Sequence, residues 1–159
     1  DLYFPITRQD ATQAAEELPI DRYRGAGESV LVVDDIKEQR DLASLMLNRL
    51  NYRVEAVGSG QAAVDYIRRR SMDILVLDMI MEPEMDGLDT YRAILNVSPG
   101  QKAIIASGFS ESDRVLEAQR LGAGRYIKKP YRLEQLGMAL RELLAVESGD
   151  DPPETVFPD

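Results

Sequence analysis

Five short apolar segments alternate with five segments of helical periodicity between residues 28 and 146, and this order constrains the fold more than any other feature of the chain. The expected strands are 30–33, 53–57, 74–77, 102–106 and 126–127. Val30–Val33 and Ile74–Leu77 are continuously apolar, which is typical of strands buried on both faces. Strict alternation predicts a parallel sheet with helices on both faces, joined by right-handed crossovers.

The expected helices follow from apolar residues spaced three and four apart. Ser59 is expected to cap the second helix, over 61–70, and Ser112 the fourth, while the third covers 88–95. Four of the helices have inward-facing residues that the spacing predicts, in chain order: Leu42, Leu45, Met46 and Leu50; Ala63, Val64 and Ile67; Val115, Leu116 and Leu121; Leu133, Leu136, Leu140 and Leu143.

The chain of 159 residues contains no Cys and no His. Disulfides, thiolate nucleophiles and imidazole bases are therefore excluded, and a metal ion has to be bound through oxygen, which favours Mg²⁺, Ca²⁺ or Mn²⁺. The net charge of −9 argues against direct binding of nucleic acid through its phosphates.

The two ends of the chain differ from the alternating region. Residues 9–27 have weak periodicity and contain Pro and Gly, so we expect a linker. Residues 147–159 are Pro-rich and acidic with no base, so we expect a disordered tail. The chain has no targeting signal and no apolar run long enough to span a membrane, so this segment is expected to be cytoplasmic, without membrane contact.

Polar residues stand where the expected strands end. Because ligands of parallel α/β sheets bind at the carboxyl ends of the strands, these residues are expected to form one site. They are Asp34 and Asp35 after the first strand, Asp78 after the third, Ser107 after the fourth, and Lys128, Lys129 and Pro130 after the fifth.

The residue types in this set suit phosphoryl chemistry. Three neighbouring carboxylates repel one another unless a cation lies between them, and Mg²⁺ binds carboxylates together with water. A lysine and a hydroxyl stabilise a phosphoryl group, and an aspartate is able to accept one as a nucleophile. Taken singly, Asp34 is more simply a helix cap and Ser107 a turn residue. Their joint placement at four strand ends favours the site.

The segments LVVDD, LVLDM, IIASG and YIKKP, in this order, resemble the receiver domain of two-component response regulators over about residues 28–146. The resemblance implies a flavodoxin-like sheet of five strands in the order 2-1-3-4-5 with five helices, the doubly wound order that chemotaxis receivers share with flavodoxin. It also implies transfer of a phosphoryl group from a phosphohistidine on a histidine kinase or histidine phosphotransfer domain. Such domains catalyse their own phosphorylation and slow dephosphorylation.

By this resemblance Asp78 is the phosphoacceptor. Asp35, Asp78 and the backbone carbonyl of Ile80 are the direct ligands of Mg²⁺, with Mn²⁺ as an alternative ion, and Asp34 acts mainly through metal-bound water. Slow loss of the phosphoryl group is expected because the apolar Ile80 and Phe109 lie near the path of water.

The remaining positions bind or respond to the phosphoryl group. Lys129 resembles the phosphoryl-binding lysine, whereas strand alternation turns Lys128 to the other side. Ser107 and Gly108 resemble the phosphoryl-binding pair, and Ser107 with Tyr126 resembles the switch pair. An ordinary half-buried strand aromatic is the alternative for Tyr126.

One departure from the family pattern falls after the acceptor. The family has Pro four and Gly eight residues after it, whereas here Glu82 is at the fourth position, Pro83 at the fifth and Gly87 at the ninth. The loop is thus expected to be one residue longer, which affects loop geometry more than metal binding.

Residues 1–8, DLYFPITR, resemble the last strand of the ATP-binding domain of histidine kinases. They suggest the C-terminal receiver of a hybrid sensor histidine kinase whose parent protein is anchored in a membrane. An ordinary N-terminal arm is the alternative. The 13 residues after Val146 are too few for a DNA-binding domain, so output is expected through another protein or a kinase.

Two other functions remain open. A Mg²⁺ phosphatase also uses an Asp nucleophile, but it typically needs a second Asp two residues later, where this chain has Ile80. A protein-interaction module of the same fold that is never phosphorylated is the other, although no site position is missing. Dimerisation is left open.

Overall fold

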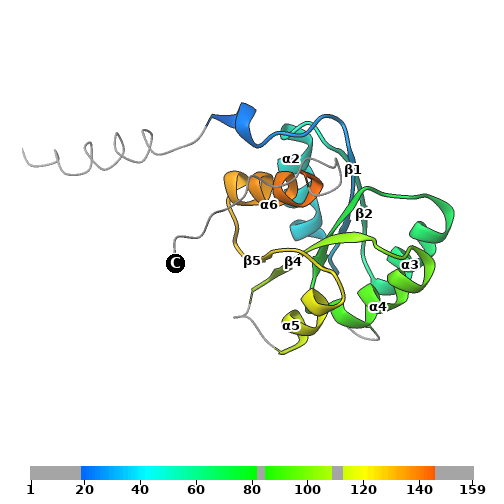
Figure 1. The fold of residues 1–159 in the computed structure, drawn as a ribbon. Helices are drawn as coiled ribbons and strands as arrows, with labels where there is room; N and C mark the ends of the chain where they lie inside the picture. Colours follow the sequence, from blue (N-terminus) through cyan, green and yellow to red (C-terminus); the bar gives the residue numbers. More distant parts are fainter. Residues whose placement is uncertain (1–18, 82–84, 109–112, 146–159) are drawn as a thin grey trace, which may run out of the picture.

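The computed structural model describes residues 19–81, 85–108 and 113–145, and in these residues a single parallel sheet forms the centre of the molecule (Figure 1). The strand order is β2-β1-β3-β4-β5, which confirms the predicted order. The strands are β1 (Ser29–Val33), β2 (Arg53–Val57), β3 (Ile74–Asp78), β4 (Lys102–Ser107) and β5 (Tyr126–Lys128).

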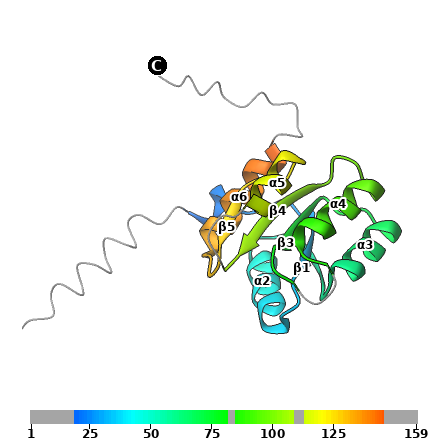
Figure 2. The same ribbon diagram turned by 90° about the horizontal axis from the view of Figure 1, so that it is seen from below.

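Helices cover both faces of the sheet, as the alternating order predicted (Figure 2). One face carries α2 and α6, and the other carries α3, α4 and α5. Their bounds are α2 (Lys37–Arg49), α3 (Gly60–Arg69), α4 (Gly87–Val97), α5 (Asp113–Arg120) and α6 (Leu133–Ala145), preceded by a short 3₁₀ helix, η1 (Ile20–Arg22).

The two apolar layers alternate along the strands. Leu31 and Leu75 belong to the layer under α3 and α4, whereas Val32 and Val76 belong to the layer under α2 and α6. All five residues of β3 are buried, because this strand lies at the centre of the sheet and is covered on both faces. The continuous apolar runs of the sequence therefore have the two-sided burial that they predicted.

The predicted inward face of α2 is wrong in part. Leu42 and Leu45 are 50% and 69% exposed, whereas the predicted Leu50 is buried and the predicted Met46 packs against the layer under α2 and α6. Ala43 and Leu47, which were not predicted, complete the buried face. Both sets are spaced three and four residues apart, so the periodicity does not choose between them. Packing against the sheet decides which face is buried, and that face includes Ala43.

The prediction for α5 is wrong for two of its three residues. Leu116 and Leu121 are 42% and 37% exposed, and the buried residues of this helix are Val115 and Ala118. By contrast, the Ser59 cap is confirmed, because its hydroxyl accepts a hydrogen bond from the Ala62 N–H at 3.1 Å. The predicted cap Ser112 lies outside the described residues.

Residues 19–27, the end of the expected linker, pack against the domain in the structure. Tyr23 is buried, and a Cβ on Gly137 of α6 would lie 2.5 Å from its ring. The Gly25 N–H donates to the Leu50 carbonyl at 2.7 Å, and a Cβ on Gly25 would lie 2.4 Å from the ring of Tyr52. The chain thus enters β1 along a fixed path between α2 and α6.

Residues 1–18 and 146–159, which include the expected kinase remnant and acidic tail, lie outside the described residues. Among the helices that the structure describes, none has the length and apolar character needed to cross a bilayer.

Mutations can distinguish the buried face of α2 from its exposed face. Leu47→Ala is expected to lower the free energy of unfolding by about 2–5 kcal/mol, because it empties a fully buried position. Leu45→Ala, the matched change on the exposed side, is expected to alter it by less than about 0.5 kcal/mol. Urea unfolding followed by circular dichroism measures both, and equal losses would contradict the observed face.

Candidate functional site

The carboxyl ends of four neighbouring strands bring the predicted polar residues together. Parallel pairing aligns Val33 with Leu77, Asp78 with Ala106 and Ser107 with Lys128. The residues that follow β1 and β5 therefore emerge beside the ends of β3 and β4. Strand register thus brings the polar residues that end or follow β1, β3, β4 and β5 to this one edge.

Three carboxylates form the centre of the site. Asp34, Asp35 and Asp78 each offer an oxygen, and these oxygens lie within 4.8 Å of one another. Asp34 and Asp78 are buried, with 4% and 6% of their surface exposed, and Asp35 is more exposed. A group of carboxylate oxygens at such separations suits a hard divalent cation.

Lys129 lies against two of these carboxylates. Its Nζ is 2.5 Å from Asp34 Oδ2 and 3.6 Å from Asp78 Oδ2. The Lys129 N–H donates to the Ser107 carbonyl at 2.7 Å, so β4 holds the backbone that carries this side chain. Lys128 is exposed, in agreement with its predicted orientation away from the site.

A turn before α2 orients Asp34. The Ile36 N–H donates to Asp34 Oδ1 at 3.0 Å, and an Arg40 guanidinium nitrogen donates to the Asp34 carbonyl at 2.9 Å. Asp34 thus accepts a hydrogen bond two residues on, as turn aspartates do, but Ile36 rather than Asp34 is the cap residue of α2. The helix-cap alternative for Asp34 therefore fails.

Burial chiefly raises the pKa of Asp78 from its ordinary 3.8 to about 6; Lys129 opposes this rise, and the nearby charge of Asp34 adds to it. The Ile80 N–H, which donates to Asp78 Oδ1 at 3.3 Å, also favours the charged carboxylate. Without a cation, burial therefore makes the ionised form of Asp78 costly.

Gly87, the first residue of α4, lies close to Asp78. The Gly87 N–H donates to the Met79 carbonyl at 3.0 Å, and a Cβ at Gly87 would lie 2.5 Å from the Asp78 carbonyl oxygen. Glu82 and Pro83, on which the expected departure rests, lie outside the described residues.

Ser107 and Tyr126 lie on the same side of the sheet. Tyr126 pairs with Ile105, and Ile105 and Ser107 are two residues apart on β4 and so point the same way. Ser107 is buried, and Tyr126 is half-buried against the layer under α3 and α4. Gly108 is exposed and lines the same pocket as Asp78, and Phe109 lies outside the described residues.

The apolar rim of the site was not predicted from the sequence. An open pocket of about 360 Å³ over Asp78 is lined also by Ile36, Leu42 and Tyr131. Leu42 was expected in the core. Burial, followed by the charges of Asp34 and Asp78, raises the pKa of Tyr131 to about 12, so this side chain remains a neutral phenol. The sequence signal that could have identified Tyr131 as a site residue is its position directly after the proline of YIKKP.

The raised pKa of Asp78 predicts a pH-dependent effect on stability. The folded state binds the proton more tightly than the unfolded state, so stability is lost as pH rises from about 4 to 6. At pH 7 in EDTA, Asp78→Asn is therefore expected to raise the free energy of unfolding, by about 1–2 kcal/mol once solvent screening is included. The gain should vanish near pH 4 in urea titrations; a pH-independent gain would contradict this cause.

The family model of the response regulator receiver domain matches residues 30–141. The chemotaxis protein CheY of Thermotoga maritima is 30% identical over 118 residues, which cover 74% of this chain and 98% of that protein. The sporulation initiation phosphotransferase F of Bacillus subtilis is 27% identical over 121 residues, which cover 76% of this chain and 97% of that protein.

Other relatives are longer proteins. The transcriptional regulatory protein ZraR of Klebsiella oxytoca is 31% identical over 129 residues, which cover 81% of this chain but only 29% of ZraR. Among solved structures, CheY4 of Vibrio cholerae aligns with a TM-score of 0.69 at 25% identity, over 75% of this chain and 100% of that one. Together with the shared strand order, the match over most of the alternating region shows that the chain belongs to the response regulator receiver domain family.

Proposed function

We propose that this receiver domain accepts a phosphoryl group on Asp78 from a phosphohistidine of a histidine kinase or histidine phosphotransfer domain in a two-component phosphorelay. The observation that carries the proposal is the position of Lys129, whose Nζ lies 3.6 Å from Asp78 within a cluster of three carboxylates. The cluster supplies the nucleophile and the ligands of a cation, and the lysine supplies positive charge for the incoming group.

The donor set of the cluster fits Mg²⁺, with Mn²⁺ as an alternative. Asp35, Asp78 and the Ile80 backbone carbonyl are the proposed direct ligands, and Asp34 contributes through water. The fit rests on carboxylate oxygens that lie within 4.8 Å of one another and on the raised pKa of Asp78, which reflects chiefly its burial and, in part, the nearby charge of Asp34. When bound, the ion neutralises charge on the carboxylates and on the transferred phosphoryl group.

The chain's own residues then prepare an in-line transfer. An ionised Asp78 oxygen forms a bond to phosphorus while the phosphorus–nitrogen bond of the donor breaks and its electron pair returns to the imidazole. The Ile80 N–H fixes one Asp78 oxygen, and Lys129 lies near the other. Ile80, 47% exposed beside the acceptor, hinders water and so slows loss of the phosphoryl group.

Phosphorylation is read out by Ser107 and Tyr126 in this proposal. The Ser107 hydroxyl moves toward the new phosphoryl oxygens, and Tyr126 occupies the space that it leaves. Their common side of the sheet and the burial of Ser107 support this pairing. Two packed arrangements of one region give the switch its two states.

The kinase context is a further part of the proposal. Residues 1–8 belong to the ATP-binding domain of a hybrid histidine kinase, 28–146 form the receiver and 147–159 form a tail. The sequence DLYFPITR supports this assignment. A histidine-containing dimerisation motif and ATP-binding motifs encoded upstream of Asp1 would agree with it, whereas an unrelated upstream sequence would remove it.

Labelling tests the acceptor directly. Wild-type protein incubated with acetyl phosphate and Mg²⁺ is expected to gain one phosphoryl group by intact mass spectrometry, and Asp78→Asn is expected to gain none, because the amide is not a nucleophile. Asp41→Asn, which changes an exposed carboxylate on α2, is the matched control and should label normally. Turnover of p-nitrophenyl phosphate would favour a phosphatase, and absence of both labelling and Mg²⁺ binding would favour an interaction module.

The two adjacent lysines provide a second test. Lys129→Gln is expected to slow labelling by about 10²-fold, because it removes charge at the transferring group. Lys128→Gln removes the same charge from the exposed side of β5 and should leave the rate within about twofold. The measurement is the initial rate of phosphoprotein formation, and equal effects of the two changes would contradict the assigned role of Lys129.

A further inference from the structure

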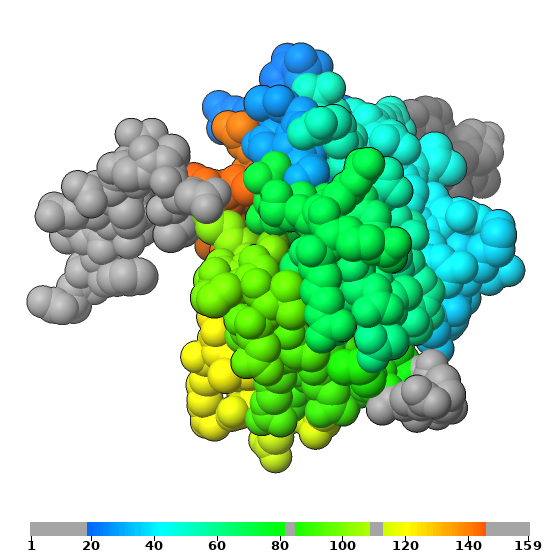
Figure 3. Space-filling model, turned by 90° about the vertical axis from the view of Figure 1, so that its right-hand side faces the viewer, coloured from blue at the N-terminus to red at the C-terminus, as the bar shows by residue number. Residues whose placement is uncertain are grey.

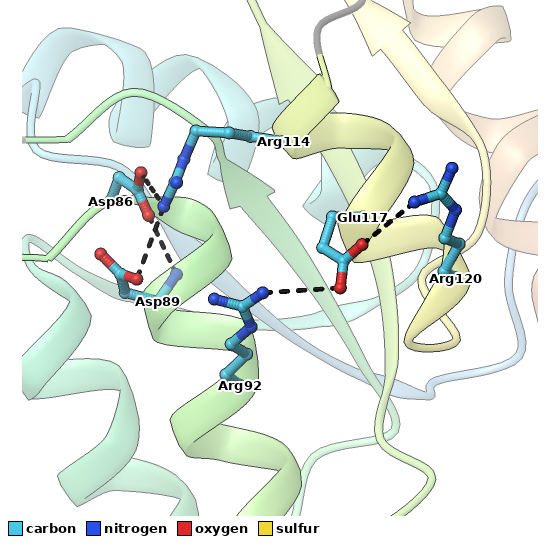
Figure 4. A network of polar contacts seen from close by, with 6 residues as sticks. All are labelled: Asp86, Asp89, Arg92, Arg114, Glu117 and Arg120. Atoms are coloured by element: carbon cyan, nitrogen blue, oxygen red, sulfur yellow. Dashed lines mark hydrogen bonds and ion pairs between the residues drawn. The ribbon is translucent and has the colours of Figure 1, made fainter.

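Ion pairs join α5 to the start and first turns of α4 (Figure 4). In the space-filling view, the green surface of α4 and the yellow surface of α5 lie next to each other (Figure 3). Arg114 of α5 contacts two carboxylates at the start of α4: an NH2 nitrogen lies 2.5 Å from Oδ2 of the N-cap residue Asp86 and 3.5 Å from Asp89 Oδ1. One turn further, Arg92 of α4 lies 3.5 Å from Glu117 of α5.

Both helices of this network follow strands that end at the site, because α4 comes after β3 and α5 comes after β4. Asp86 caps α4 by accepting a hydrogen bond from the Asp89 N–H at 2.9 Å. It directly precedes Gly87, whose N–H bonds to the Met79 carbonyl beside Asp78. Arg114 stands at the start of α5, the helix that follows the Ser107 loop. Arg114 therefore fastens together the two segments that leave the site after β3 and β4.

Apolar packing holds α5 less firmly than α4. The buried residues of α5 are Val115 and Ala118, whereas α4 buries five residues, two of them the large side chains Tyr91 and Ile94. The side chains of Arg114, Asp86 and Asp89 are 48%, 28% and 49% exposed, so solvent and salt screen their pairs. Contacts of this kind are weak enough to be exchanged when a small region repacks.

We propose that Arg114 acts as a clasp that holds α5 against the start of α4 in the unphosphorylated domain, and that opening the clasp is part of the conformational switch. The inference rests on the proposed function, since the switch follows phosphorylation of Asp78. A clasp that favours one of two states lowers the affinity of any ligand that prefers the other. Its removal should therefore tighten binding of a phosphoryl mimic and loosen α5 in the free domain.

Arg114→Gln tests the clasp, and Arg120→Gln is its matched control. Arg120 lies on the same helix but pairs with Glu117 of that helix, at 3.3 Å, so its replacement removes equal charge without separating the helices. In the full chain without ligand, hydrogen exchange at the α5 amides should become about fivefold faster in Arg114→Gln and stay near wild type in the control. The apparent Kd for beryllofluoride with Mg²⁺, followed by tyrosine fluorescence, should fall about threefold in Arg114→Gln alone.

Salt provides an independent arm of the same experiment. Raising NaCl from about 0.05 M to 0.5 M shortens the Debye length to a few ångströms and should reproduce the faster α5 exchange in wild type, with a smaller effect in Arg114→Gln. Unchanged exchange and an unchanged Kd in Arg114→Gln, with normal beryllofluoride binding by wild type, would overturn the clasp alone. Failure of wild type to bind beryllofluoride would overturn the proposed function and the clasp with it.

Discussion

The central constraint on the site is that two aspartates, Asp34 and Asp78, are buried at the end of a sheet, where an ionised carboxylate is costly. Carboxylates in such surroundings lose hydration and repel each other, which is why the pKa of Asp78 rises to about 6 even though Lys129 opposes the rise. The fold bears this cost at one edge because apolar strands covered on both faces stabilise the rest of the domain. A site with unbalanced negative charge is well suited to a cation and to an electrophilic phosphoryl group.

Several features of the surroundings serve the same carboxylates. The turn at Ile36 fixes Asp34, and β4 holds the backbone of Lys129. The absence of a side chain at Gly87 lets α4 start directly against Asp78. The two segments that leave the site are in turn joined by the pairs of Arg114. The strands that carry the site are firmly packed, whereas α5, the helix proposed to move, is held in part by weak contacts that can be exchanged. A conformational switch needs both properties.

Sequence patterns predicted the alternating strands and helices, and they placed the residues after the strands at one edge of the sheet, because both follow from strong local signals. Continuous apolar runs mark buried strands, and in a parallel sheet the residues just after them must meet at one edge. The faces of α2 and α5 were predicted less well. Alternative sets of residues share the helical period in α2, and only contact with the sheet chose Leu47 and excluded Leu45. In α5 the same contact favoured Ala118 over Leu116.

The amino-acid sequence was enough to predict the alternating architecture from its periodicity, the strand order from a family resemblance, and the acidic and basic residues that follow the strands. The tertiary structure decided what depends on distance and burial: that Lys129 reaches both Asp34 and Asp78, that residues 19–27 lie packed between α2 and α6, and that Arg114 bridges two helices. The reason is that period and order are properties of neighbours along the chain, whereas charge pairing and solvent exclusion arise between residues that only folding brings together.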